Sequence, residues 1–127
     1  MSKLNCILKI IFHLTNFMLI LFYLYPGSIF GYIIYGDLKQ QPQITTDFLN
    51  ISSNHFYVFL LLSFLGILAY KKDKKINFYK IYLFLLSILI ELFHILIPQR
   101  SFEYSDLLGN LMGFFTVLLL FKIWKKV

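Results

Sequence analysis

Four apolar stretches of this chain are long enough, or nearly so, to cross a lipid bilayer as a helix, which needs roughly 20 mostly apolar residues. Only 14% of the residues are charged and 59% are hydrophobic, whereas about a quarter of a soluble domain is charged. The composition therefore predicts an all-α membrane protein, in which residues 1–127 form a single domain, a bundle of four transmembrane helices. The predicted spans cover residues 10–25, 52–70, 76–97 and 107–124.

The first predicted span leaves two alternatives open. It ends at Pro26-Gly27, yet residues 29–35 (IFGYIIY) are apolar again. This segment either prolongs the helix past a proline kink or lies in the membrane interface, with its tyrosines at the level of the head groups. No small-residue cleavage site follows the first span, so we expect a retained helix and not a removed signal peptide.

Lysine and arginine set the predicted orientation, because cytoplasmic segments of membrane proteins carry an excess of these residues. With four spans, the chain start, the connection 71–75 and the chain end lie on one side. Both termini are therefore predicted to be cytoplasmic, and the connections 26–54 and 98–106 to face outward. Basic clusters beside apolar runs suit anionic head groups, so we expect membrane lipids and no nucleic acid as partners. Ten of the twelve basic residues lie on this predicted cytoplasmic side, namely Lys3, Lys9, Lys71, Lys72, Lys74, Lys75, Lys80, Lys122, Lys125 and Lys126.

The chain places its rarest residue types near the predicted outer ends of three spans. Glu91 lies six residues before the end of the third span, or about 9 Å deep at 1.5 Å per residue. His94 follows one turn later on a similar face, and positions 106, 110 and 113 succeed one another at helical spacing. The predicted polar cluster consists of His55, Glu91, His94, Arg100, Asp106, Asn110 and Gly113.

Glu91 requires a partner, because a carboxylate at the centre of a membrane helix costs at least about 2.5–3.5 kcal/mol. Arg100 follows Pro98 in the short outer loop, and its planar guanidinium group suits a carboxylate. We therefore expect a pair between Glu91 and Arg100, with His55 or His94 as the other candidates to share the charge.

The fourth span should contribute three different functions to the cluster. Asp106 or Ser105 can cap its first turn by accepting hydrogen bonds from free amides. Asn110 can form a hydrogen bond across a helix interface, and Gly113 allows two backbones to approach closely.

Three interpretations of this cluster remain open. It can hold the helices together, bind a lipid-linked or wall-linked group in an outward-facing pocket, or form a catalytic pocket with glutamate and histidine as acid and base. The sequence has no serine elbow, HExxH or CxxC motif, so we assign no catalytic residue. His94, Glu91 and His55 could ligate a metal by residue type, but their spacing does not constrain such a site, and we predict neither a metal nor a cofactor.

The third and fourth spans carry a pattern that resembles the signature of the VanZ-like family, which reads E-x-x-Q, P-x-R and then D-x-x-x-N-x-x-G. The histidine of this chain stands where the family usually has glutamine. His55-Phe56 and Tyr25-Pro26 are similar to further family segments. The matching pattern here is Glu91-x-x-His94, Pro98-x-Arg100 and Asp106-x-x-x-Asn110-x-x-Gly113.

The resemblance implies a small bacterial integral membrane protein of the cell envelope, present in the cell membrane as a multi-pass protein. The namesake of the family is associated with resistance to the glycopeptide teicoplanin. We therefore expect a non-catalytic protein whose outward-facing pocket binds a lipid-linked cell-wall component or an amphiphilic antibiotic. A membrane-embedded enzyme acting on an envelope lipid and a structural subunit of a membrane complex are the alternatives.

Overall fold

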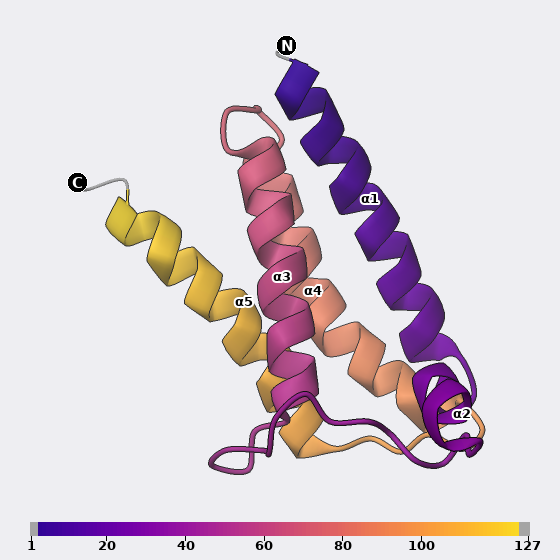
Figure 1. The fold of residues 1–127 in the computed structure, drawn as a ribbon. Helices are drawn as coiled ribbons and strands as arrows, with labels where there is room; N and C mark the ends of the chain where they lie inside the picture. Colours follow the sequence, from indigo (N-terminus) through magenta and orange to yellow (C-terminus); the bar gives the residue numbers. More distant parts are fainter. Residues whose placement is uncertain (1–2, 125–127) are drawn as a thin grey trace.

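The computed structural model describes residues 3–124, and within them the chain is helical, with no β-strand beyond one isolated bridge between Phe48 and Ile51. Four of the helices are long and apolar enough to cross a membrane, which confirms this part of the prediction. A single 3₁₀ turn follows α4 at residues 94–96. The helices are α1 (Lys3–Leu24), α2 (Ile29–Tyr35), α3 (Ser53–Tyr70), α4 (Ile76–Phe93) and α5 (Tyr104–Trp124) (Figure 1).

Two of the long helices begin earlier than the apolar runs predict. The first begins at Lys3 instead of near residue 10, and α5 begins at Tyr104 instead of residue 107. Hydropathy marks only the stretch that suits hydrocarbon, whereas backbone hydrogen bonding carries a helix on into more polar sequence at its ends. The helices α3 and α4 begin within one residue of the predicted positions 52 and 76.

The apolar segment after α1 forms a separate helix, α2, and does not prolong the first span. The chain turns at Gly27, where φ is 81°, a conformation that glycine adopts without strain. The hydroxyl oxygen of Ser28 then accepts a hydrogen bond from the amide of Gly31 at 2.9 Å and so caps α2. The helix ends at Gly36, with φ of 73°. The alternative in which this segment prolongs the first helix is therefore wrong, and its location in the interface stays a prediction.

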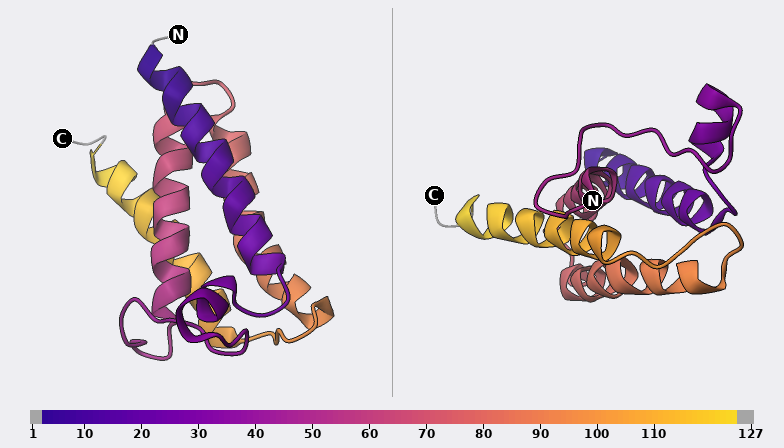
Figure 2. Two further views of the ribbon diagram at one scale, coloured as in Figure 1. Left: turned by 45° about the vertical axis from the view of Figure 1, so that its right-hand side comes forward. Right: turned by 90° about the horizontal axis from the view of Figure 1, so that it is seen from below.

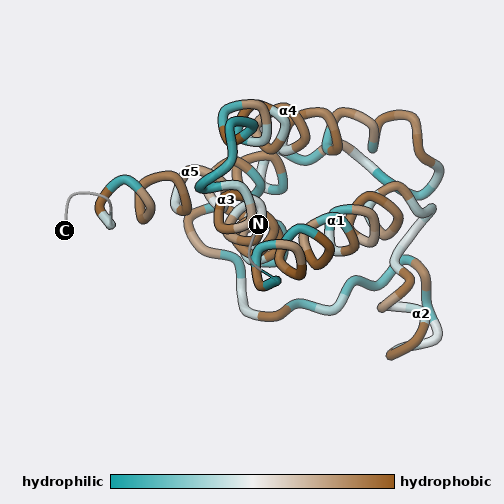
Figure 3. The backbone as a smooth tube through the Cα atoms, turned by 90° about the horizontal axis from the view of Figure 1, so that it is seen from above, coloured by the Kyte–Doolittle hydropathy of each residue, from teal (hydrophilic) through white to brown (hydrophobic). Residues whose placement is uncertain are grey.

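The central helix of the bundle is α3, which packs against α1, α4 and α5 (Figure 2). Its side chains Phe59 and Leu62 are fully buried, as is Leu83 of α4. In contrast, α1 leaves large apolar side chains such as Leu14 and Phe17 each 61% exposed. The hydropathy colours show apolar residues along most of each helix (Figure 3). An apolar surface of this extent suits contact with lipid.

Glycines let α5 cross α3 at very short range. A Cβ atom added to Gly109 would lie 2.6 Å from the carbonyl oxygen of Ser52, and one added to Gly113 would lie 2.5 Å from that of Phe56. The two glycines are one helical turn apart, in the small-xxx-small arrangement of close membrane helix pairs. This contact fixes the start of α3 against the start of α5.

Polar contacts also join the helices at a distance from the predicted cluster. Nε2 of His13 lies 2.8 Å from the hydroxyl of Tyr70. Asn16 exchanges two hydrogen bonds with the hydroxyl of Tyr82, at 2.6 and 2.9 Å. These bonds attach α1 to α3 and α4.

The two ends of the bundle differ in what they contain. The start of α1, the turn between α3 and α4, and the end of α5 lie together at one end (Figure 1). At the other end, α2 and the linker from residue 37 to residue 52 lie beneath the tips of the long helices (Figure 1). The predicted polar cluster is at this second end.

We expect Gly113→Ala to lower the thermal stability of the protein in detergent by the equivalent of about 1–3 kcal/mol, because the new methyl group meets the backbone of α3. The matched control is Met112→Ala, whose side chain is 44% exposed on the neighbouring position. Thermal unfolding of both purified variants measures the difference. Equal melting temperatures for the two would contradict a close α3–α5 contact at the glycine.

Candidate functional site

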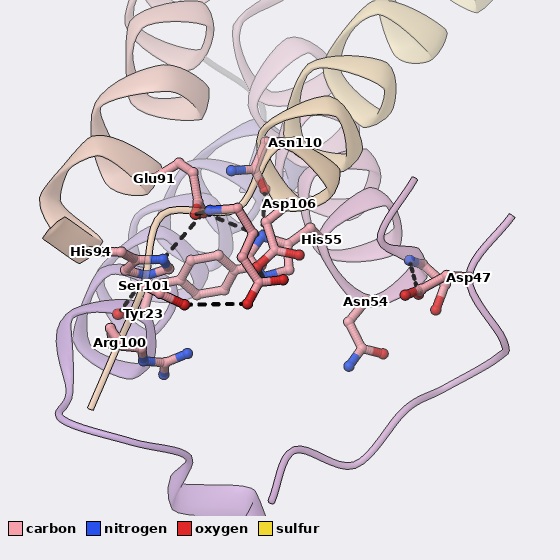
Figure 4. Close-up of polar contacts among 12 residues, drawn as sticks. Tyr23, Asp47, Asn54, His55, Glu91, His94, Arg100, Ser101, Asp106 and Asn110 are labelled. Carbon is pink, nitrogen blue, oxygen red and sulfur yellow. Dashed lines mark hydrogen bonds and ion pairs between the residues drawn. The ribbon is translucent and has the colours of Figure 1, made fainter. Parts of the chain in front are cut away.

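The polar cluster forms where the end of α1, the start of α3, the end of α4 and the start of α5 meet (Figure 4). Within it, His55, Glu91, His94 and Asn110 are each at most 2% exposed. The structure thus brings together residues that are far apart in sequence. The predicted Gly113 lies in the α3–α5 contact and contributes no side chain to the cluster.

His55 is held between two residues of α5. Its Nδ1 atom lies 3.0 Å from Oδ1 of Asn110, and its Nε2 atom lies 3.2 Å from Oδ2 of Asp106. The amide nitrogen of Asn110 donates to the carbonyl oxygen of Ser87 at 3.1 Å. The amide therefore presents its oxygen to the ring, so Nδ1 of His55 carries the hydrogen and Nε2 faces the carboxylate.

His94 has a similar arrangement at the end of α4. Its Nε2 atom lies 3.0 Å from the carbonyl oxygen of Tyr23, which can only accept a hydrogen bond. Nδ1 then faces Glu91, with Oε2 at 3.2 Å. The other carboxylate oxygen of Glu91 accepts a hydrogen bond from the amide of Glu103 at 3.0 Å, and Oε2 lies 4.0 Å from Nδ1 of His55.

Both histidines therefore present one remaining ring nitrogen to a carboxylate. The pairs are His55 with Asp106 and His94 with Glu91. In surroundings of low dielectric constant, such a pair is stable when both groups are charged or both are neutral, because one unpaired charge is costly. Each pair therefore holds one proton in either state, and another positive charge can take its place.

The predicted pair between Glu91 and Arg100 is wrong. The Nη2 atom of Arg100 donates to the carbonyl oxygens of Phe22 and Gly27 at 3.1 and 2.7 Å, and its Nε atom lies 3.3 Å from that of Tyr25. Carbonyls at a helix C-terminus lack partners and carry partial negative charge, so they attract a cation. Partial burial lowers the pKa of Arg100 from its ordinary value, but a guanidinium group stays protonated in proteins.

The expected capping role of Asp106 or Ser105 is also wrong. The carbonyl oxygen of Glu103 accepts hydrogen bonds from the amides of Asp106 and Leu107, at 3.2 and 3.1 Å. Helix α5 has already begun at Tyr104. The Asp106 carboxylate is therefore free to turn toward His55.

Several contributors to the site could not be found by sequence reasoning. Tyr23, Ser87 and Glu103 supply backbone atoms, and the ring of Tyr23 lies 4.8 Å from that of His55 between centroids. A backbone group leaves no signal in the residue types. Gly109 is different, because its spacing from Gly113 is a recognisable small-xxx-small pattern.

Two cavities adjoin the cluster. One has a volume of about 350 Å³ and is mostly apolar, and the other has a volume of about 240 Å³ and is mostly polar. They share Ser28, Gln41 and Arg100. The apolar cavity is lined mainly by Leu19, Phe22, Tyr23, Ile29, Phe30, Pro42, Ile44, Asn54, His55 and Val58, and the polar one by Gly27, Leu38, Lys39, His94, Gln99, Ser101, Glu103 and Asp106.

Comparison of the chain with protein-family models, with curated proteins and with solved structures gave no match. The VanZ-like resemblance therefore rests on the residue pattern between Glu91 and Gly113 and stays a prediction.

We expect Arg100→Ala to destabilise the protein by about 1–3 kcal/mol, because carbonyl groups at the end of α1 lose their donor. Arg100→Lys should recover only part of the loss, since an ammonium group lacks the planar fork of donors. Thermal unfolding in detergent measures both. The control is Lys39→Ala at the same end of the bundle, whose side chain is exposed. A loss for Arg100→Ala no larger than that of the control would contradict this role.

Proposed function

We propose that this protein is a VanZ-like, multi-pass protein of a bacterial cell membrane that binds an amphiphilic molecule without transforming it. The apolar chain of the ligand lies in the cavity between α1, α2 and α3. Its polar head group lies at Arg100 and in the adjoining polar cavity. Lipid-linked cell-wall components and acylated antibiotics belong to this class of ligand.

The observation that carries this proposal is the junction of the two cavities at Arg100. Ligand pockets are mostly apolar with a few placed polar groups. Here the apolar cavity has side chains such as Leu19, Phe22 and Val58, and it shares Arg100 with the polar cavity. A ligand that fits both cavities must therefore be amphiphilic.

The residues around the polar cavity favour an anionic head group with hydroxyl or amine groups beside it. Arg100 uses Nε and Nη2 for the carbonyls of α1, and among the described residues its Nη1 atom forms no hydrogen bond. This nitrogen and Lys39 can bind a phosphate or carboxylate. The carboxylates of Glu103 and Asp106, which line the same cavity, can accept from neighbouring donors.

The proposal includes an outward-facing site. Eight of the ten lysine and arginine residues that the structure describes belong to segments at the opposite end of the bundle, which favours a cytoplasmic location for that end. Lys125 and Lys126, also predicted to be cytoplasmic, lie outside the described residues. Reporter fusions after Gln43 and after Lys126 test this, with an external signal expected only from the first. An external signal from the second would overturn the orientation.

We expect Val58→Trp to fill the apolar cavity and to reduce several-fold the envelope lipid that co-purifies with the protein in native membrane discs. Leu61→Trp is the matched control, because Leu61 is 53% exposed on the same helix and does not line the cavity. Mass spectrometry of extracted lipids gives the ratio of lipid to protein. Equal lipid retention by wild type and both variants would contradict binding in this cavity.

The same variants test the antibiotic part of the proposal. Expression of the wild type in a glycopeptide-susceptible Gram-positive host should raise tolerance to teicoplanin more than to vancomycin, because the acyl chain of teicoplanin partitions into the leaflet at the depth of the cavity. Leu61→Trp should preserve this tolerance and Val58→Trp should remove it, at matched membrane levels. Unchanged susceptibility to both drugs with the wild type would eliminate the resistance role.

A membrane-embedded enzyme acting on an envelope lipid is the second candidate. The observation that favours it is the presence of two buried histidine–carboxylate pairs beside the polar cavity, since such pairs can serve as general acid and base. Turnover of a labelled envelope lipid that Glu91→Gln abolishes, with lipid retention unchanged, would favour the enzyme over the binding protein.

A further inference from the structure

We propose that His55, Glu91 and Asp106 form a binding site for one divalent transition metal ion, for which Zn²⁺ is the best match. This goes beyond the proposed binding of an amphiphile and does not rest on it. The ion would lie within the polar cluster, between α3, α4 and α5, with one ligand from each helix.

The distances between the donor atoms suit a shared ion. One ligand atom from each of the three residues lies within 4.8 Å of the other two. Nε2 of His55 and Oδ2 of Asp106 are 3.2 Å apart. With metal bonds of about 2.0–2.2 Å, the donor atoms of a tetrahedral site are about 3.4 Å apart. The third ligand, Glu91, has Oε2 at 4.0 Å from the other ring nitrogen of His55, Nδ1, so binding one ion requires its side chain to rotate toward Nε2.

A buried oxygen of Glu91 without a hydrogen bond points to the same conclusion. Glu91 is 0% exposed, and its Oε2 atom accepts no hydrogen bond. Nδ1 of His94 is within ion-pair distance at 3.2 Å but is not in line for a hydrogen bond. A buried acceptor left in this state costs about 1–3 kcal/mol or more. A cation beside Oε2 would satisfy it.

The surrounding hydrogen bonds are those expected around metal ligands. A ligating histidine usually donates its other ring N–H to a fixed acceptor, and a ligating carboxylate is hydrogen-bonded in turn. Nδ1 of His55 donates to Asn110, whose amide is fixed by the carbonyl oxygen of Ser87. This leaves the lone pair of Nε2 available. The amide of Glu103 holds Oε1 of Glu91 and leaves Oε2 for the ion.

Charge balance also favours a divalent ion. With His55 and His94 both neutral, the two carboxylates carry two negative charges in a mostly buried place. Among the described residues, no lysine or arginine forms an ion pair with Glu91 or Asp106, and Arg100 donates to backbone carbonyls instead. A buried charge without a partner is strongly unfavourable, and one divalent cation neutralises both carboxylates.

The donor types and the access route narrow the identity of the ion. One imidazole and two carboxylates, with no thiolate, suit Zn²⁺ and, next to it, Mn²⁺ or Fe²⁺. Asp106 also lines the polar cavity, so water and ions can reach it. Three protein ligands leave an open coordination position for a ligand group.

The test uses full-length protein without a histidine tag, purified in detergent and stripped with a chelator. Titration with Zn²⁺, Mn²⁺ and Co²⁺, followed by metal analysis after desalting, should show one ion per chain. The Co²⁺ form should absorb in the visible region, with an intensity typical of tetrahedral coordination. Asp106→Asn and Glu91→Gln should each weaken Zn²⁺ binding at least about tenfold. Loss of a residue that only hydrogen-bonds to a metal ligand already has an effect of about this size, and loss of a ligand should have a larger one.

The control is Asp73→Asn, which removes a carboxylate at the opposite end of the bundle, where it pairs with Lys9 at 2.6 Å. It should bind Zn²⁺ as the wild type does. Helix content and gel filtration confirm that each variant is folded. Failure of the wild type itself to retain any of the three ions overturns the proposal, even if the site variants do not fold. Equal binding by Asp106→Asn and Asp73→Asn overturns it as well. Lipid retention by the Val58→Trp and Leu61→Trp variants is measured separately. Failure of the metal site can therefore be distinguished from failure of amphiphile binding.

Discussion

The backbone contact between α3 and α5 is the constraint on which the polar site depends. At Gly109 and Gly113 the two helices approach so closely that an added methyl carbon would lie 2.6 Å from the carbonyl oxygen of Ser52 or 2.5 Å from that of Phe56. This contact holds the first turn of α3 beside the first turns of α5. His55 consequently meets both Asp106 and Asn110, at 3.2 and 3.0 Å. A wider separation of these helices would leave the histidine without either partner.

The polar groups at this end satisfy one another through backbone as much as through side chains. Two histidines each place one ring nitrogen on a fixed acceptor and turn the other toward a carboxylate. Hydrogen bonds in such a network offset the free-energy cost of removing its polar groups from water only when every group has a partner. The unsatisfied Oε2 atom of Glu91 is therefore the exception that marks the centre of the site. His94 and Glu103, which contact Glu91, line the polar cavity, and this cavity shares Arg100 with the apolar one.

Much of the fold could be predicted from the sequence, because the bilayer imposes simple requirements. The four apolar runs predicted the four long helices, and the clustering of His55, Glu91, His94, Asp106 and Asn110 followed from helical spacing and alternating direction of the spans. The partner of Arg100 could not be predicted, because its acceptors are backbone carbonyls at the end of α1. The start of α5 was misplaced for a related reason, since its first hydrogen bonds run to the backbone carbonyl of Glu103 and residue type does not show this.

The attachment of Arg100 to α1 also has a consequence for the order in which the chain is assembled. Its three carbonyl acceptors are synthesised 73 to 78 residues before the arginine itself. During that interval the second and third spans are made, and the exposed carbonyls must be solvated by water or head groups, because hydrocarbon cannot serve them. His13 and Asn16 of α1 bind Tyr70 and Tyr82, so only the end of α1 waits for Arg100. The bonds from Arg100 to the end of α1 therefore form only after the residues of α3 and α4 have been synthesised.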